Sequence, residues 1–226
     1  AGFAVSEKMR AQIRGMEQAE RNVQDGISMV QTAEGALEEA GNIAQRMREL
    51  GVQAGNDTLS DDDRTKVKEE LKQLQDEMSK IATETKFNGK ELLNKAGASF
   101  TIQAGANSET RKITTANLSG IANGLSTISV SSSTDAQSFV TKVDAALESI
   151  NAARSELGAM QNRLEYTANN LTTSTENLTA AESRIRDVDV AKEMVTLSKL
   201  NILNQASQAM VSQAKQQPES VSQLLR

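Results

Sequence analysis

The sequence predicts a mainly α-helical fold: an elongated antiparallel helical bundle with a small β-hairpin region and a C-terminal helical tail. Three observations support this prediction. Apolar residues recur in alternating steps of three and four over long stretches, proline occurs once in 226 residues, and aromatic residues make up only 2% of the chain. So few large apolar side chains favour narrow seams between helices over one thick core.

The first helix is expected over about residues 5–56. Its apolar seam starts at Val5, continues by heptad steps to Leu37 and extends more loosely to Leu50. Glycines recur along this helix at Gly15, Gly26, Gly35, Gly41 and Gly51, and each costs a helix roughly 1 kcal/mol relative to alanine. Such a helix needs packing partners, and Gly51 is expected to loosen its last turns.

The second helix is expected over about residues 60–86. Ser60 is a good N-cap, and the acidic triplet Asp61-Asp62-Asp63 suits the positive end of a helix dipole. A metal site is the competing interpretation, but the triplet lacks the glycine and the distal glutamate of a calcium loop, so we favour capping. The seam of this helix comprises Val67, Leu71, Leu74, Met78 and Ile81.

A small β region is expected over about residues 87–133. Phe87-Asn88-Gly89 predicts a turn, while Ser99–Gln103 and Arg111–Thr115 alternate apolar and polar residues as short strands do. Ser126–Val130 is a candidate third strand. The region therefore predicts short hairpins and no large sheet.

The third helix is expected over about residues 135–189, where the apolar seam continues for about seven heptads. The three helices can then pack as a bundle, with the first two lying along the third. Near the end of this helix, Asp187 and Asp189 could ligate a metal, but salt bridges with Arg184 and Arg186 are the favoured interpretation.

The last segment, residues 190–226, keeps an apolar stripe but has few charges among many Gln, Ser and Asn residues. With no partner left in the chain, this stripe is predicted to bind another chain, and Pro218 is expected to end or kink its helix. The isolated segment is expected to be disordered and to fold on binding. The predicted contact residues are Leu197, Ile202, Leu203, Met210, Val211, Val221, Leu224 and Leu225.

The composition excludes several classes of function. Without cysteine or histidine, the chain has no thiolate or imidazole nucleophile, no disulfide and none of the usual zinc or haem ligands. Its few aromatic residues and net charge of −5 disfavour nucleic acid and acidic membrane surfaces as partners, and it has no run of eighteen apolar residues. We therefore expect no enzyme activity, catalytic residue, cofactor, metal, nucleic acid or membrane span.

Several segments closely resemble bacterial flagellins, in the family's order and across nearly the whole chain. They are Ser6–Arg10, Asp25–Ser28 with Gln31–Leu37, Phe87–Gly89, Leu157–Leu164 and Asn177–Asp189. The resemblance implies a rod domain over residues 1–189, a filament-core segment over residues 190–226 and no variable outer domain. It also implies a natural C-terminus, and a partner helix before Ala1 that is missing here. Without that helix, this chain is expected to stay soluble and not to polymerise.

The resemblance further implies a structural subunit of the flagellar filament, exported unfolded by the flagellar type III apparatus and polymerised for swimming motility. It would occupy the extracellular flagellum after a cytoplasmic stage. The implied partners are other flagellin subunits, a flagellin-specific export chaperone on the C-terminal segment, and vertebrate Toll-like receptor 5 on the rod domain. The receptor contacts would be Gln45, Arg46, Leu50 and Glu70, although the pattern alone predicts an ordinary solvated helix face at these positions.

Two other classes of protein compete with this interpretation. A coiled-coil signalling module of the chemoreceptor type is also rich in Ala, Gln and Glu, but the β region and the flagellin-like segments disfavour it. A hydrolase that uses carboxylates is disfavoured because the region between the helices is short and the chain has no histidine or cysteine.

Overall fold

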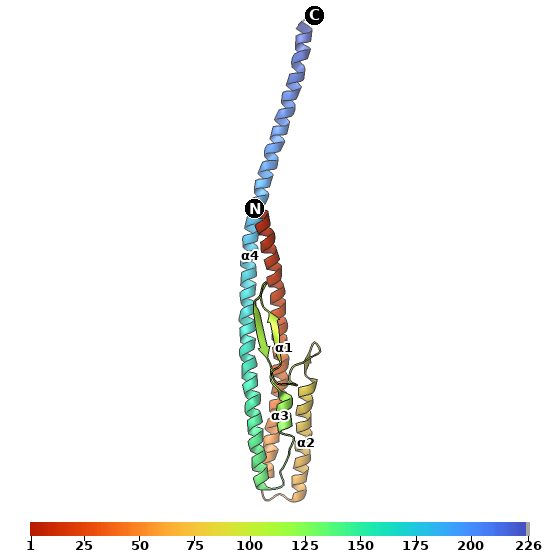
Figure 1. Cartoon of the computed structure of the whole chain (residues 1–226), viewed down its shortest axis with the longest axis vertical. Coiled ribbons are helices and arrows are strands. Elements are labelled where there is room, and N and C mark those ends of the chain that lie inside the picture. The colour runs from red at the N-terminus through yellow and green to blue at the C-terminus, as the bar shows by residue number, and fades with distance from the viewer. Residues whose placement is uncertain (225–226) are drawn as a thin grey trace. The chain divides into compact units, whose positions relative to one another are not determined.

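The computed structural model describes residues 1–224, and for residues 217–222 it describes the backbone alone. The mainly helical fold, the small β region and the helical C-terminal segment are confirmed (Figure 1). The elements in chain order are α1 (Gly2–Ala54), α2 (Asp61–Glu84), β1 (Lys86–Phe87), β2 (Lys90–Glu91), β3 (Ser99–Gln103), β4 (Thr110–Thr114), α3 (Leu118–Gly124) and α4 (Ser133–Leu224).

The chain forms two compact units, and both α1 and α4 contribute to each of them. The larger unit comprises residues 15–173, and the smaller comprises residues 1–14 with residues 174–226. In the larger unit, a Cβ on Gly41 would lie 3.7 Å from Ile150 Cγ2, and one on Gly51 would lie 2.7 Å from Val140 Cγ2. Residue numbers rise along α1 as they fall along α4, so the predicted antiparallel packing is confirmed within this unit (Figure 1).

The predicted apolar seams form the core of the larger unit. Burying one such side chain is worth roughly 1.5–3 kcal/mol, so narrow seams of this length are enough to hold a bundle. Each of the three long helices contributes. The wholly buried members include Val23, Val30 and Leu37 of α1, Leu71 and Met78 of α2, and Val143, Ile150 and Leu164 of α4.

The turn predicted after α2 joins β1 to β2, which pair antiparallel with Phe87 opposite Lys90. Its two central residues, Asn88 and Gly89, have φ values of 51° and 76°. Positive φ at both positions is the conformation of tight hairpin turns, and Asn followed by Gly is the sequence that adopts it at least cost. The Asn-Gly pair therefore fixes where this hairpin reverses.

The second hairpin rests on α1. Phe100 of β3 pairs with Ile113 of β4, which confirms both predicted strands. A Cβ on Gly26 of α1 would lie 3.2 Å from Cγ1 of Ile102, so the missing side chain lets the hairpin approach the helix. Asn22 Nδ2 donates to the carbonyl oxygen of Gln103 at 3.2 Å.

The predicted third strand at Ser126–Val130 is wrong, because these residues have no strand conformation. Ile128 and Val130 are buried in the apolar core, so their alternation reflects core packing and not strand pairing. The sequence patterns did not predict the short helix α3, which Asn117 caps by accepting a hydrogen bond from Gly120 N at 3.0 Å.

The tail differs from one expectation. It is helical through Leu224, so Pro218 does not end the helix. The disorder expected of the isolated segment stays a prediction. Because the tail continues α4, it does not carry the nucleation cost that makes isolated helices marginal. The proposed domain boundary after residue 189 falls inside this one helix, and that division stays a prediction.

Candidate functional surfaces

The residues implied in receptor binding lie on α1 and α2, where Arg46 bridges the two helices. Its Nη1 lies 3.2 Å from Glu49 Oε2 on the same helix, and its Nη2 lies 3.1 Å from Glu70 Oε1 on α2. The hydrogen bonds to Glu49 and Glu70 raise the pKa of Arg46 above its ordinary value. All three side chains are exposed, so the surface offers a guanidinium held in place between two carboxylates.

The other two candidate receptor residues differ from each other in exposure. Gln45 lies on the surface beside Arg46. Leu50 is 1% exposed and belongs to the bundle core, so its predicted role as an apolar contact for a receptor is wrong. Five positions separate Gln45 from Leu50, which places them about 140° apart around α1, so Gln45 faces the solvent while Leu50 faces the other helices.

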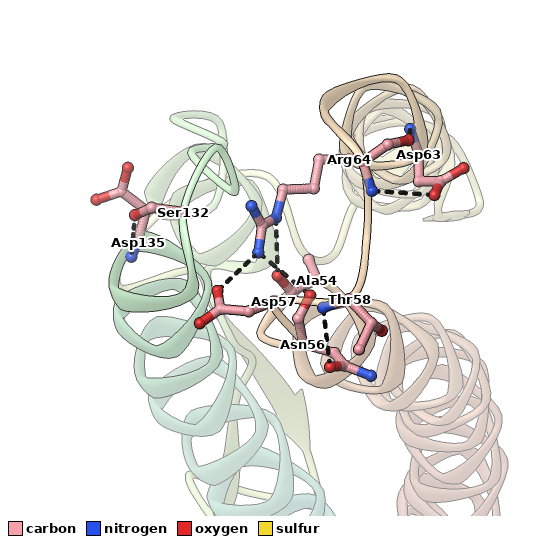
Figure 2. Close-up of polar contacts among 9 residues, drawn as sticks. Ala54, Asn56, Asp57, Thr58, Asp63, Arg64, Ser132 and Asp135 are labelled. Atoms are coloured by element: carbon pink, nitrogen blue, oxygen red, sulfur yellow. Dashed lines mark hydrogen bonds and ion pairs between the residues drawn. The ribbon is translucent and has the colours of Figure 1, made fainter.

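Arg64 of α2 organises the connection between α1 and α2 (Figure 2). Its Nε donates to the carbonyl oxygen of Ala54 at 3.3 Å, and its Nη2 donates to Asn56 O at 3.2 Å and contacts Asp57 Oδ1 at 3.3 Å. The carbonyls at the end of a helix have no partner within the helix and carry a partial negative charge. A cation from the next helix therefore closes α1, and no local pattern in the sequence pointed to it.

The predicted N-cap of α2 is confirmed as a reciprocal capping box. Ser60 Oγ accepts a hydrogen bond from Asp63 N at 3.1 Å, and Asp63 Oδ2 accepts one from Ser60 N at 3.1 Å (Figure 2). These bonds to the Ser60 backbone and side chain lower the pKa of Asp63. Asp62 instead pairs with Lys66 at 3.7 Å, so the acidic triplet serves the start of the helix.

The start of α4 carries a similar, simpler cap. Ser132 Oγ accepts a hydrogen bond from Asp135 N at 3.1 Å (Figure 2). The Asp135 carboxylate accepts one from Ser131 Oγ at 3.0 Å. An anionic side chain in the first turn also suits the helix dipole. Both α2 and α4 thus begin at polar side chains that accept hydrogen bonds from free backbone N–H groups.

The apolar side chains of the tail lie on the surface of α4. We call them the α4 stripe. Each side chain is more than half exposed. Leu225 and the side chain of Val221 lie outside the described residues. The members of the α4 stripe are Leu197 at 59%, Ile202 at 65%, Leu203 at 53%, Met210 at 72%, Val211 at 55% and Leu224 at 86% exposed.

Asp187 and Asp189 do not form the predicted salt bridges within the described residues. Asp187 accepts a hydrogen bond from Ser183 Oγ at 3.2 Å, and Arg186 Nη1 lies 3.8 Å from Glu182 Oε1. Glu182 is buried, so its charge is less screened by solvent and attracts the arginine one turn away. A charged residue on the apolar face of a helix is the sequence signal that could have predicted the burial of Glu182.

The described part of the chain shows no cluster of three or more acidic, His or Cys side chains that could hold a metal ion. Among residues 1–224, no helix has enough continuous apolar sequence to cross a membrane. What the structure does offer is a helical bundle with capped ends, one charged surface across two helices, and a helix with an uncovered apolar face. These features define a helical bundle protein with an exposed apolar helix face.

Comparison with known proteins identifies the family. The model of the bacterial flagellin N-terminal helical region matches residues 1–98, and that of the bacterial flagellin C-terminal helical region matches residues 140–225. The chain belongs to the bacterial flagellin family, whose members are structural subunits of the flagellar filament.

Individual relatives agree with this assignment. The flagellin of Halalkalibacterium halodurans is 52% identical over the whole chain, which covers 84% of that relative, and the flagellin of Bacillus subtilis is 44% identical, with 86% covered. The crystal structure of Bacillus cereus flagellin matches with a TM-score of 0.61 and 34% identity, over 72% of this chain and 94% of that one. Nothing in these comparisons supports the chemoreceptor alternative.

Proposed function

We propose that the α4 stripe is the surface through which this flagellin associates with partner helices, first those of a flagellin-specific export chaperone and then those of neighbouring subunits. The exposure of the stripe carries this proposal. Soluble proteins rarely leave a continuous apolar face in water, and such a face marks a binding surface. An amphipathic helix that docks into an apolar groove buries this kind of stripe.

The same proposal covers the route to the filament. The subunit is exported through the flagellar type III apparatus, with a cytoplasmic stage during which the chaperone covers the stripe and prevents early polymerisation. Outside the cell, subunits make heterologous contacts that do not close, which produces an open helical polymer. The protein acts by packing alone and performs no catalysis.

Two aspartates in the stripe test the proposal. Ile202→Asp together with Leu203→Asp places two charges among side chains that would be buried, and each lost apolar contact is worth roughly 1.5–3 kcal/mol. Affinity for the export chaperone, measured by isothermal titration calorimetry, should therefore fall at least about 100-fold.

Asn201→Asp with Gln205→Asp is the matched control, since it adds the same two charges at exposed polar positions of the same helix. This control should bind the chaperone nearly as the unmodified protein does. Circular dichroism should show an intact bundle in both variants. Unmodified chaperone affinity in the Ile202 and Leu203 variant would show that the stripe is not the association surface.

A second proposed contact is with vertebrate Toll-like receptor 5, through Gln45, Arg46 and Glu70. The support is the exposed guanidinium between two carboxylates on adjacent helices. Arginine side chains in a fixed orientation are common at the centre of protein interfaces, because they form paired hydrogen bonds with little loss of entropy.

A further inference from the structure

In the smaller unit, the buried carboxylate of Glu182 brings together residues of both helices. Ser6 Oγ on α1 donates a hydrogen bond to Glu182 Oε1 at 2.7 Å. Arg10 Nε, one turn further along α1, lies 3.6 Å from the same oxygen, and Arg186 Nη1 lies 3.8 Å from it. The Glu182 side chain is 6% exposed, and Ser6 is 3% exposed. One hydroxyl donor and two guanidinium groups therefore converge on one buried oxygen.

The position of Glu182 would suit an apolar residue. Leu178 and Ile185, on the same side of α4, are members of the apolar seam. Removing a carboxylate from water costs desolvation free energy, and attraction to its ionic partners offsets that cost only when the geometry of the pair is favourable. A buried ion pair is thus a weak source of stability compared with a well-packed apolar side chain, but it discriminates strongly between alignments that satisfy it and alignments that do not.

Apolar contacts discriminate less than the polar contacts of Glu182 between alternative alignments of α1 and α4. Residues 1–14 of α1 contribute few apolar contacts, because Ile13 is buried but Met9 is only half-buried and Val5 is 49% exposed. If these residues moved along α4 by one helical turn, about 5.4 Å, little apolar contact would be lost. Ser6 and Arg10 would move away from Glu182, and its carboxylate would remain buried without partners from α1. The polar contacts therefore distinguish alignments that the apolar seam alone would leave similar in energy.

We infer that Glu182 is a register-setting residue, which fixes the axial alignment of α1 against α4 in the smaller unit. Ser6 supplies the short, directional bond, and Arg10 supplies charge. Arg186 lies on α4 itself and moves with Glu182, so it balances the carboxylate in any register without selecting one. The alignment in turn decides which residues of α4 are covered by α1.

Paired cysteines can report this alignment, because the chain contains no native cysteine. A Cβ on Gly2 would touch the carboxylate of Asp189. Gly2→Cys with Asp189→Cys therefore marks the native register, while Gly2→Cys with Glu193→Cys marks a slip of one turn. A disulfide requires Cβ atoms about 3.5–4.5 Å apart, so its yield distinguishes the two alignments. The yield is measured on the full chain, in dilute glutathione buffer, by non-reducing electrophoresis.

With Glu182 present, the native cysteine pair should form a disulfide at least about ten times more readily than the slipped pair. Glu182→Leu should bring the two yields within about twofold of each other while the helical circular dichroism signal is retained. Glu176→Leu, the same replacement at an exposed position of α4 in the same unit, should keep the native preference. A native preference retained by Glu182→Leu would overturn the inference.

A second set of variants keeps the test decisive if Glu182→Leu does not fold. Ser6→Ala with Arg10→Gln removes both partners on α1, and it should raise the yield of the slipped pair. Glu182→Gln, whose amide oxygen can still accept the bond from Ser6, should keep the native preference. If the Ser6 and Arg10 variant stays wholly in the native register, the alignment is set elsewhere and the inference is wrong.

Discussion

Gly51 of α1 lies against Val140 of α4 so closely that a Cβ on Gly51 would come within 2.7 Å of Val140 Cγ2. Valine is branched at Cβ and has little rotational freedom within a helix, so it cannot easily move aside. Gly51 was expected to loosen the end of α1, but the helix continues unbroken to Ala54. The absence of a side chain at this position allows α4 to pack closely on α1.

Gly51→Ala should therefore destabilise the protein. The added methyl group forces a shift that typically costs 1–3 kcal/mol, which outweighs the helix-propensity gain of roughly 1 kcal/mol. We expect a net loss of about 1 kcal/mol in the free energy of unfolding, measured by urea denaturation. Gly35→Ala is the control, since a Cβ there would meet no atom within 4 Å, and it should stabilise the helix by roughly 0.5–1 kcal/mol. Equal stabilisation by both substitutions would contradict the packing argument.

The capping box of α2 should make stability depend on acid pH. The pKa of Asp63 in the folded protein lies below the ordinary value of 3.8, so its contribution is present above about pH 4 and is lost as pH falls through the folded-state pKa. Asp63→Asn should weaken this pH dependence of stability in thermal melts recorded between about pH 2 and about pH 6. Ser60→Ala should cost about 1 kcal/mol at neutral pH. An acid transition of Asp63→Asn identical to that of the unmodified protein would argue against a contribution of the capping box to stability.

Arg64 should contribute more to stability than the other cations of α2, because its side chain is only 12% exposed and bonds two backbone carbonyls. Arg64→Met keeps the aliphatic stem and removes these bonds, so it should cost about 1.5–3 kcal/mol in urea denaturation. Lys66→Met removes an exposed ion pair and should cost less than about 0.5 kcal/mol. Similar losses in the two variants would mean that Arg64 does not close α1.

The proposed receptor contact predicts a clear difference between two arginines of α1. Arg46→Ala should reduce signalling through Toll-like receptor 5 at least about tenfold in a reporter-cell dose response. Arg48→Ala removes an equally exposed arginine, which pairs with Asp144 at 2.6 Å, and should change the response little. Leu50→Ala is not an equivalent test, because it opens a cavity in the core and costs roughly 2–5 kcal/mol of stability. Unchanged potency of Arg46→Ala would remove Arg46 from the site.

Local patterns predicted much of the fold. Ser60 with its acidic triplet fixed the start of α2 within one residue, Asn88-Gly89 fixed the first hairpin turn, and alternation predicted β3 and β4. These features depend on bonds between residues close in sequence, so a short window contains the information. The alternation at Ile128 and Val130 misled the strand prediction, because burial against helices produces the same pattern when no neighbouring strand is available.

The candidate surfaces could be predicted only in part. The sequence located the α4 stripe, and each of its described side chains is exposed. The resemblance to flagellins placed Leu50 among the receptor contacts, whereas the heptad seam placed it on the apolar face of α1, and Leu50 is buried as the seam predicts. Arg64 was missed because its partners lie at the end of α1 and in the connection that follows it.

The sequence by itself determined where the helices and turns form, which faces are apolar and which family the chain resembles, because these follow from local hydrogen bonding, heptad spacing and matched segments. Only the tertiary structure decided that Gly51 packs closely against Val140 and that Arg64 donates a hydrogen bond to the carbonyl at the end of α1. The same holds for Glu182, which accepts a hydrogen bond from Ser6 and pairs with Arg10. Each of these contacts joins residues of different helices. Their energy depends on separation and burial at that contact, and neither quantity is encoded in the spacing of residues along one helix.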